Sequence, residues 1–524
     1  MRRGDIIEGT VEELRFPDKG ILHAEDGNGA DREITVKNVL PGQRVSARIA
    51  KKRSGRLEAN LAEILEPAPY EIEASCPHFG ICGGCQYLNI TPQKELEIKE
   101  GQVRRLLAPS EEEDLFWFEG ILESPLTEGY RNKMELTFGD SVKDGPLTLG
   151  MHRRGSFYDV IDADECRIAD EDFRRIIRSA REYWAGTGAP YYRRMRREGY
   201  LRHLILRKGM RTGEILVDLV TTTQVHLLQG FPSHGLSAPA APASRDPIGE
   251  FPFVNSSQSA CRLRAGAGEK DALPLERERA MLQGFADALL SLDLDGAICG
   301  ILHTRNDSVA DIVEDQGTEI LCGRASFEEE LLGLKFTVTP FSFFQTNSAG
   351  AELVYETGRS YIAQAAASDT REAGSGRKPV IYDLYCGTGT ISLLMAPAAS
   401  KVIGVEIVEE AVQAARANAV RNGAGNCEFI AGDVLKVLDE IDEKPDFIIL
   451  DPPRDGVHPK ALPKILRYGV PYILYISCKP TSLARDLPLM REAGYEAVRG
   501  VSVNQFPKTA NMETIVLLSR IVHP

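Results

Sequence analysis

The sequence predicts an α/β protein in which a doubly wound parallel sheet at the C-terminus follows a small β-barrel and a central α+β region. From residue 380 onward, apolar strands alternate with helices, and such strand–helix units build a parallel sheet covered on both faces. Residues 4–66 contain five short alternating strands separated by Gly and Pro turns, which is typical of a small barrel. Residues 120–230 mix strand and helix patterns, as expected of an α+β region.

These changes of pattern predict three domains, at residues 1–67, 68–340 and 341–524. Within the second, TPQKELEIKEGQVRRLLA has helical spacing, with Thr91 as N-cap and Pro92 at the first helical position. We expect this helix, residues 91–108, to pack on the C-terminal domain. Residues 232–275 are rich in Pro, Ala, Ser and Gly, which predicts a flexible inserted loop.

The composition is that of a globular protein with sizeable cores. The chain has 524 residues, of which 43% are hydrophobic and 26% charged. It contains no apolar run of about 18 residues, which argues against a membrane span, and the segment MRRGDIIEGT lacks the apolar centre of a secretory signal. We therefore expect a cytoplasmic protein, in which cysteines serve metal binding or catalysis more often than disulfides.

Charge gives two opposing indications about a nucleic-acid partner. The net charge of −14 argues against one. Local patches decide phosphate binding, however, and residues 191–211 are strongly basic with the single acid Glu198. The alternative is an ordinary solvated basic face. The basic residues of this stretch are Arg193, Arg194, Arg196, Arg197, Arg202, Arg207, Lys208 and Arg211.

Three cysteines are clustered in CPHFGICGGCQYLN, namely Cys76, Cys82 and Cys85. Tetrahedral zinc and cubane iron–sulfur sites both require four ligands, so a metal site needs a fourth ligand from elsewhere in the chain. Chance clustering is the alternative.

A ligand-binding turn is predicted where the first strand of the C-terminal sheet meets its helix, in DLYCGTGT. Glycines there allow a ligand to approach the backbone, and Glu406 ends the next strand, where an acid commonly accepts a ribose hydroxyl. A tight turn with a solvent-facing acid is the alternative. Cys478 stands at the carboxyl end of another parallel strand, and such ends face the ligand crevice. An ordinary buried cysteine is the alternative at that position.

The motifs FFQTN, DLYCGTGT, DPPR, SCKP and FPKTANMET occur in this order and together resemble those of the RNA uracil-5-methyltransferase family. DLYCGTGT followed by VIGVE is similar to the S-adenosylmethionine pocket of class I methyltransferases. The resemblance covers most of the chain and implies a class I methyltransferase (Rossmann-like) doubly wound sheet. Ser392 replaces the third glycine of the NAD fingerprint, which disfavours a dehydrogenase. Residues 1–66 resemble a TRAM domain, an OB-like RNA-binding barrel found in part of the family.

The resemblance also implies roles for individual residues. Cys478 is the expected nucleophile and Glu513 the expected base. Lys508 and Asn511 depart from histidines that relatives often carry there, and Arg454 replaces the base-stacking aromatic of amino-methyltransferases. The positions expected to bind the cofactor are Gln345, Tyr385, Glu406 and Asp451. Those expected to hold a 4Fe–4S cluster are Cys76, Cys82, Cys85 and Cys166, with zinc as the chemical alternative.

The implied activity is methylation of RNA uridine at carbon 5 with S-adenosylmethionine, and we expect ribosomal RNA, in particular 23S, rather than transfer RNA. The target base must leave its stack to be reached, which favours single-stranded or loop RNA gripped by the barrel and the basic stretch. Two other classes stay open: a non-catalytic RNA-binding protein with a metal site, and a methyltransferase for a protein or for cytosine. We expect a monomer with no membrane partner.

Overall fold

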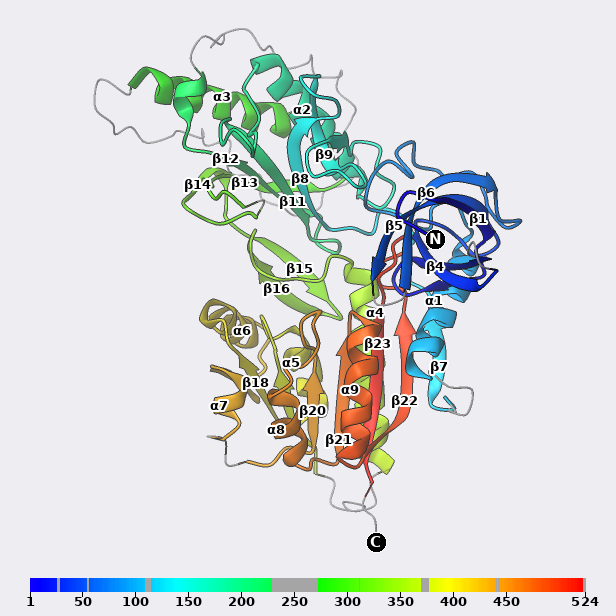
Figure 1. Cartoon of the computed structure of the whole chain (residues 1–524). Helices are drawn as coiled ribbons and strands as arrows, with labels where there is room; N and C mark the ends of the chain where they lie inside the picture. The colour runs from blue at the N-terminus through cyan, green and yellow to red at the C-terminus, as the bar shows by residue number, and fades with distance from the viewer. Residues whose placement is uncertain are drawn as a thin grey trace.

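The computed structural model describes residues 1–25, 29–53, 56–108, 115–228, 272–310, 312–368, 377–439, 441 and 443–521. Helices and strands of both parallel and antiparallel sheets are present, so the predicted α/β class is confirmed. Figure 1 shows the N-terminal strands (blue) beside a central α+β unit (cyan to green) and above the C-terminal sheet (yellow to red). Within the described ranges, no helix combines the length and apolar character that crossing a membrane requires.

The N-terminal strands form a 6-stranded sheet in the order β1-β5-β6-β4-β3-β2. The sheet curls around its own apolar core, so that β1 also contacts β3. Six strands are present where the sequence predicts five, because Val11 and Glu12 separate β1 from β2 and their backbone amides donate hydrogen bonds to the Gln43 and Ile21 carbonyls. The strands are β1 (Ile6–Thr10), β2 (Glu13–Arg15), β3 (Lys19–Glu25), β4 (Asp31–Lys37), β5 (Arg44–Arg53) and β6 (Arg56–Glu66).

The central unit is a 7-stranded sheet in the order β10-β9-β8-β11-β12-β13-β14, with α2 and α3 packed on one face. A hairpin of β15 (Phe327–Leu331) and β16 (Leu334–Val338) follows it and packs on the C-terminal core. The other elements are β8 (Lys133–Asp140), β9 (Leu147–His152), β10 (Val160–Asp162), α2 (Glu171–Thr187), β11 (Leu201–Lys208), β12 (Glu214–Thr221), the 3₁₀ turn η1 (Val225–Leu228), α3 (Ala272–Leu290), β13 (Ala297–Arg305) and β14 (Thr318–Gly323). Of the predicted insertion 232–275, residues 272–275 open α3 and the rest lies outside the described residues.

The C-terminal sheet is 8-stranded, in the order β19-β18-β17-β20-β21-β23-β22-β7. Strands β17 to β21 run parallel, whereas β23 is antiparallel to both neighbours. Helices α4, α5 and α6 cover one face, and α7, α8 and α9 cover the other. The strands are β17 (Val380–Leu384), β18 (Lys401–Glu406), β19 (Cys427–Ala431), β20 (Phe447–Leu450), β21 (Tyr472–Ser477), β22 (Tyr495–Val503) and β23 (Glu513–Arg520). The helices are α4 (Ser348–Ser368), α5 (Thr390–Met395), the 3₁₀ turn η3 (Ala396–Ala398), α6 (Glu409–Arg421), α7 (Val434–Val437), α8 (Ala461–Arg467) and α9 (Pro480–Glu492).

Two elements that precede the central sheet belong to this C-terminal layer. Helix α1 (Pro92–Leu107) packs against α9, and its N-cap is Thr91 as predicted, whose side chain accepts a hydrogen bond from the Lys94 amide. Strand β7 (Phe118–Leu122) pairs in parallel with β22 at the edge of the sheet. The sheet therefore includes residues that the predicted boundary at 341 leaves out, because a pairing between such distant segments carries no local sequence signal.

Candidate active site

The predicted nucleophile and base lie at the ends of neighbouring strands. Cys478 directly follows β21, and Glu513 is the first residue of β23. These strands are antiparallel, and their last pair is Ser477 opposite Thr514. One residue beyond this pair, Cys478 and Glu513 lie near each other, and the charge of Glu513 acts on the Cys478 thiol. The fold thus brings together two residues that are far apart in the chain.

Asp451 completes an acidic group around the thiol. It directly follows β20, the strand beside β21. Burial, and then the charges of Glu513 and Asp451, raise the pKa of the Cys478 thiol to about 12, while the Arg454 guanidinium opposes this. Burial and the charge of Asp383 raise the pKa of Asp451 to about 7. Cys478 is therefore a protonated thiol at neutral pH until a ligand changes these surroundings.

Glu513 has the features of a strong buried base. Its side chain is 3% exposed, and its Oε2 has no hydrogen-bond partner among the described residues. Burial, and then the charge of Asp451, raise its pKa well above the ordinary value, with Arg454 acting in the opposite direction. A carboxylate with an unused oxygen and a raised pKa accepts a proton readily from a group placed against it.

The turn after β17 has the strained backbone of a ligand-binding turn. Tyr385 has a φ of 71°, which non-glycine residues rarely adopt and which marks stored strain. Gly389 has a φ of 79°, and a Cβ there would lie 2.9 Å from Phe429 and Ala415, so only glycine fits. Glu406, at the end of β18, accepts a hydrogen bond from the Gly387 amide at 3.1 Å. Of the predicted cofactor positions, Tyr385 and Glu406 therefore border one turn.

Gln345, the remaining predicted cofactor position, lies just before α4. Its side chain hydrogen-bonds Tyr355, a buried tyrosine of α4. Burial, and then the charge of Asp451, raise the pKa of Tyr355, with smaller effects from Glu513 and Asp383. Tyr355 thus interacts both with Gln345 and with the buried carboxyls of the site. No motif marks it in the sequence, because one tyrosine on an apolar helix face is indistinguishable from a core residue.

Asp383, in the predicted turn motif but not among the predicted site residues, is a second buried carboxylate of the site. Its Oδ2 accepts a hydrogen bond from the Ser392 hydroxyl at 2.5 Å, and Oδ1 has no partner among the described residues. Burial raises its pKa to about 6. Ser392, which stands where the NAD fingerprint has its third glycine, therefore holds Asp383 in place. That substitution is the feature of the sequence that could have pointed to Asp383.

The four predicted metal ligands gather in one place. Cys76, Cys82, Cys85 and Cys166 line the same small cavity of about 50 Å³. Burial, and then the neighbouring Cys166, raise the pKa of Cys85, which reflects how close the thiols stand. Among the described residues, no three or more His, Cys, Asp or Glu side chains are arranged so that they could hold a metal ion. The four cysteines line one cavity.

The loop before Glu513 is held by segments from the first third of the chain. The backbone amides of Gln86 and Tyr87, directly after Cys85, donate hydrogen bonds to the Lys508 carbonyl at 2.8 and 3.1 Å. The Lys508 amide in turn donates to Glu95 of α1 at 2.8 Å. The ammonium of Lys99, fully buried, bonds Glu95, the Asn504 side chain and the carbonyls of Phe506 and Asn511. The cysteine segment and α1 thereby fix the loop that leads into the base.

The basic stretch around residue 200 is not one continuous charged surface. Arg202, Arg207 and Lys208 are buried in or next to β11, which corrects the prediction that the whole stretch grips RNA. Arg207 donates to the carbonyls of Thr339, Pro340 and Ser342, and Lys208 pairs with Asp170 and Asp172. These cations join elements of the fold, because a strand in the middle of a sheet buries its side chains. The exposed cations of the stretch are Arg194, Arg196, Arg197 and Arg211.

Known proteins resemble this chain over its whole length. A sequence model of the family described as tRNA (Uracil-5-)-methyltransferase matches residues 362–521. An uncharacterized RNA methyltransferase of Clostridium tetani is 42% identical over 99% of this chain and 99% of its own. One from Caldanaerobacter subterraneus is 40% identical over 99% of this chain and 100% of its own.

Among solved structures, the tRNA (uracil-54, C5)-methyltransferase of Pyrococcus abyssi, in complex with S-adenosyl-L-homocysteine, covers 98% of this chain and 100% of its own with a TM-score of 0.65. At 22% identity this likeness concerns the fold, and it confirms the predicted class I methyltransferase architecture. On the strength of the full-length relatives and the family match, the chain belongs to the RNA uracil-5-methyltransferase family and is an S-adenosylmethionine-dependent RNA methyltransferase.

Proposed function

We propose that the protein forms 5-methyluridine in 23S ribosomal RNA by covalent catalysis through Cys478. The observation that carries the proposal is the closeness of Cys478, directly after β21, to Glu513, the first residue of β23, whose charge acts on the Cys478 thiol. The Cys478 thiolate adds to carbon 6 of uracil, which makes carbon 5 nucleophilic. The cofactor supplies the methyl group that carbon 5 acquires. Glu513 then takes the proton from carbon 5, and the thiolate leaves as the ring double bond re-forms.

The charges of the site suit these steps once both ligands are bound. The three carboxyls Glu513, Asp451 and Asp383 have raised pKa values because burial and their mutual repulsion disfavour the ionised forms, and a cationic sulfonium beside them would stabilise those forms. A positive charge placed there lowers the pKa of the Cys478 thiol and of the carboxylates, which favours the thiolate and an ionised base. We propose that Gln345, Tyr385, Glu406 and Asp451 hold the cofactor. Asp451 also borders the thiol, so it is placed to hydrogen-bond the uracil ring as well.

The preference for ribosomal RNA rests on the resemblance of residues 1–66 to a TRAM barrel and on the cysteine set. We propose that the β1–β6 barrel contacts RNA away from the flipped base. The description of the matching family favours transfer RNA as the second candidate substrate. Both substrates require the same chemistry at Cys478, so they differ only in what binds outside the cleft.

The test is to map 5-methyluridine in total RNA from a strain that lacks the protein, before and after incubation with the purified enzyme and cofactor. We expect at least one uridine of 23S ribosomal RNA to gain the methyl group. Modification of transfer RNA alone would overturn the ribosomal substrate and leave the chemistry standing. Modification of neither RNA would overturn the proposed function.

We further propose that Cys76, Cys82, Cys85 and Cys166 hold a 4Fe–4S cluster with a structural role. Four thiols around one cavity are a suitable donor set, and zinc is the alternative metal. Uracil methylation transfers no electron, so the reaction gives the cluster no redox task. The hydrogen bonds from Gln86 and Tyr87 to Lys508 instead connect the cysteine segment to the loop before Glu513. Convergence of the sulfurs on a cluster would rigidify that connection.

Protein purified without oxygen should be brown and contain about four iron and four sulfide per chain. Cys166→Ser should lower the iron content strongly, because it removes one of four ligands. Cys299→Ser is the matched control, since Cys299 is a free cysteine outside the cavity. Metal analysis and the visible absorption spectrum give the answer without an activity assay. Colourless protein with one bound zinc would refute the cluster.

A further inference from the structure

A cavity that lies outside the active site is in the central unit. It has a volume of about 420 Å³, within the range of pockets that hold small ligands. Its floor includes Thr137 of β8 and His203 of β11, whose Oγ1 and Nδ1 lie 3.4 Å apart. Leu136 belongs to the core beneath α2, so its neighbour Thr137 faces the other side of the sheet. The cavity therefore opens on the face that α2 and α3 leave uncovered.

The rim of this cavity combines exposed aromatic and apolar side chains with free cations. Phe157 and Met195 are each 79% exposed and Tyr158 is 61% exposed. Large apolar side chains that are exposed together commonly mark an interaction site. Arg194 and Arg196 stand beside them, and neither has an ion-pair partner among the described residues. Flat apolar groups next to unpaired guanidinium groups suit a base and its phosphate.

Side chains that line the cavity are held in place by contacts within the protein. The Arg202 guanidinium stacks on the Tyr192 ring at 4.6 Å and donates hydrogen bonds to the carbonyls of Asn306, Ser308 and Ala310. The Tyr191 hydroxyl donates a hydrogen bond to the Asp140 carboxylate at 2.6 Å, so this carboxylate already has a partner within the protein. Because these side chains are already ordered, they lose little conformational freedom when a ligand binds.

We propose that this cavity binds an unpaired nucleotide of the substrate RNA other than the target uridine, with its base against Phe157 and Tyr158 and its phosphate at Arg194 and Arg196. The inference rests on the proposed function in taking RNA as the substrate. It adds a second anchoring point, which selects RNA whose loop places an extruded base at the correct distance from the target.

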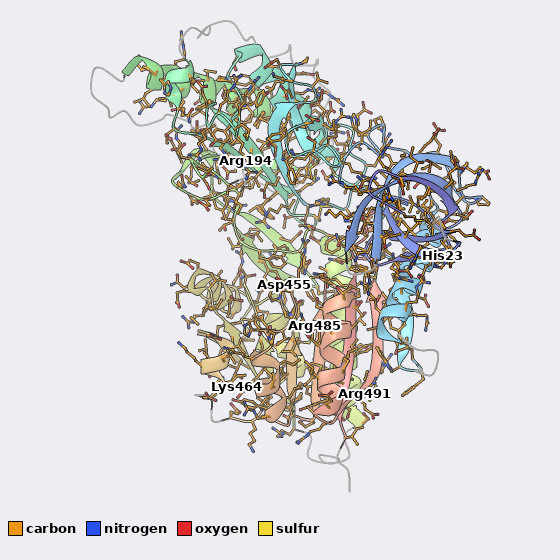
Figure 2. All side chains as sticks on the ribbon, in the orientation of Figure 1. His23, Arg194, Asp455, Lys464, Arg485 and Arg491 are labelled. Carbon is orange, nitrogen blue, oxygen red and sulfur yellow. The ribbon has the colours of Figure 1, made fainter. Side chains whose placement is uncertain are left out.

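The position of the cavity excludes the target uridine as its occupant. The side-chain amide of Asn132, the residue directly before β8, donates a hydrogen bond to the Gln345 carbonyl, so Asn132 lies next to a position proposed to bind the cofactor. Thr137 lies five residues along the strand, or roughly 17 Å away at the rise of a β-strand. Figure 2 shows Arg194 on the central unit and Asp455, from the loop after β20, on the C-terminal unit, with the β15–β16 hairpin between them. One nucleotide cannot reach both places.

Binding of single-stranded RNA of mixed sequence tests the proposal without any methylation, using fluorescence anisotropy and two probes. One probe is long enough to span both sites and the other is a trinucleotide. For the long probe, we expect the double variant Phe157→Ala/Tyr158→Ala and the double variant Arg194→Gln/Arg196→Gln each to bind about 10-fold more weakly or worse, as loss of stacking or phosphate contacts does elsewhere. Trinucleotide binding at the target site should not change. Matched controls are Arg197→Gln, an exposed neighbour outside the cavity, and Phe116→Ala, a 78% exposed phenylalanine elsewhere.

Kinetics with an RNA that the wild type methylates separate anchoring from chemistry. The cavity variants should raise KM and leave kcat near the wild-type value, because the cavity touches no reacting atom. Unchanged binding of the long probe by both variants would overturn the second anchoring point. Binding of free uridine or adenosine monophosphate that long RNA does not displace would assign the cavity to a free nucleotide and also overturn it. Failure of the wild type to methylate any RNA would instead count against the proposed function. The test of the second anchoring point would be unaffected, because it compares RNA binding and needs no methylation.

Discussion

Cys478→Ala should lower the methylation rate by at least about 10³-fold while leaving cofactor binding nearly unchanged, because the thiol serves only the covalent step. Single-turnover transfer of a labelled methyl group to RNA measures the loss, and calorimetric titration with the cofactor measures binding. Cys322→Ala is the matched control, since Cys322 is a free, partly exposed cysteine of β14 in the central unit. Substantial turnover by Cys478→Ala would remove Cys478 from the role of nucleophile.

The raised pKa of the Cys478 thiol gives this prediction a pH dependence. With a pKa of about 12, the thiol is protonated at pH 7 to 8, and iodoacetamide reacts with thiolates. In the free enzyme, Cys478 should therefore be alkylated more slowly than an ordinary exposed cysteine, and the rate should rise with pH throughout the accessible range. Addition of the cationic cofactor should accelerate the reaction at fixed pH, because a positive charge lowers the pKa. Mass spectrometry of the peptide that contains Cys478 follows both effects.

Glu513→Gln should stall the enzyme after methyl transfer and trap a covalent complex between RNA and protein. The amide cannot accept the proton of carbon 5, so the thiolate cannot be expelled. Denaturing electrophoresis should show an adduct that requires cofactor and RNA, and methyl label should be present in it. The variant Cys478→Ala/Glu513→Gln should form none, because it has no nucleophile. Absence of an adduct from Glu513→Gln would mean that another group removes the proton.

The same substitution should not unfold the protein. Burial and the charge of Asp451 disfavour the ionised form of Glu513, which is why its pKa is raised. A neutral glutamine of the same shape removes that repulsion, so the melting temperature should stay equal or rise. A large decrease would show that the loss of activity comes from misfolding.

Local patterns in the sequence were sufficient for much of the C-terminal sheet and for the types of residue in the site. The alternation of apolar strands and helices after residue 380 predicts the parallel strands β17, β18, β20 and β21, because buried parallel strands are largely apolar. The glycines of the first turn and the acid at the end of the next strand predict a ligand at their shared edge. Thr91 and Pro92 mark the start of α1 for an equally local reason, since a helix N-terminus needs an acceptor for its free amides.

Tertiary structure alone decided which of these residues meet. The antiparallel pairing of β21 and β23 brings Cys478, directly after β21, close to Glu513, and the pairing of β7 with β22 brings an early segment to the edge of the sheet. Arg207 and Lys208 look like RNA ligands in the sequence, but the centre of a sheet buries them, and they bond to carbonyls and aspartates instead. The sequence by itself determined the local conformations and the chemistry of each side chain, because these depend on near neighbours. Only the folded chain decided burial, pairing and the pKa of Cys478, because these arise from contacts between segments that are not neighbours in the sequence.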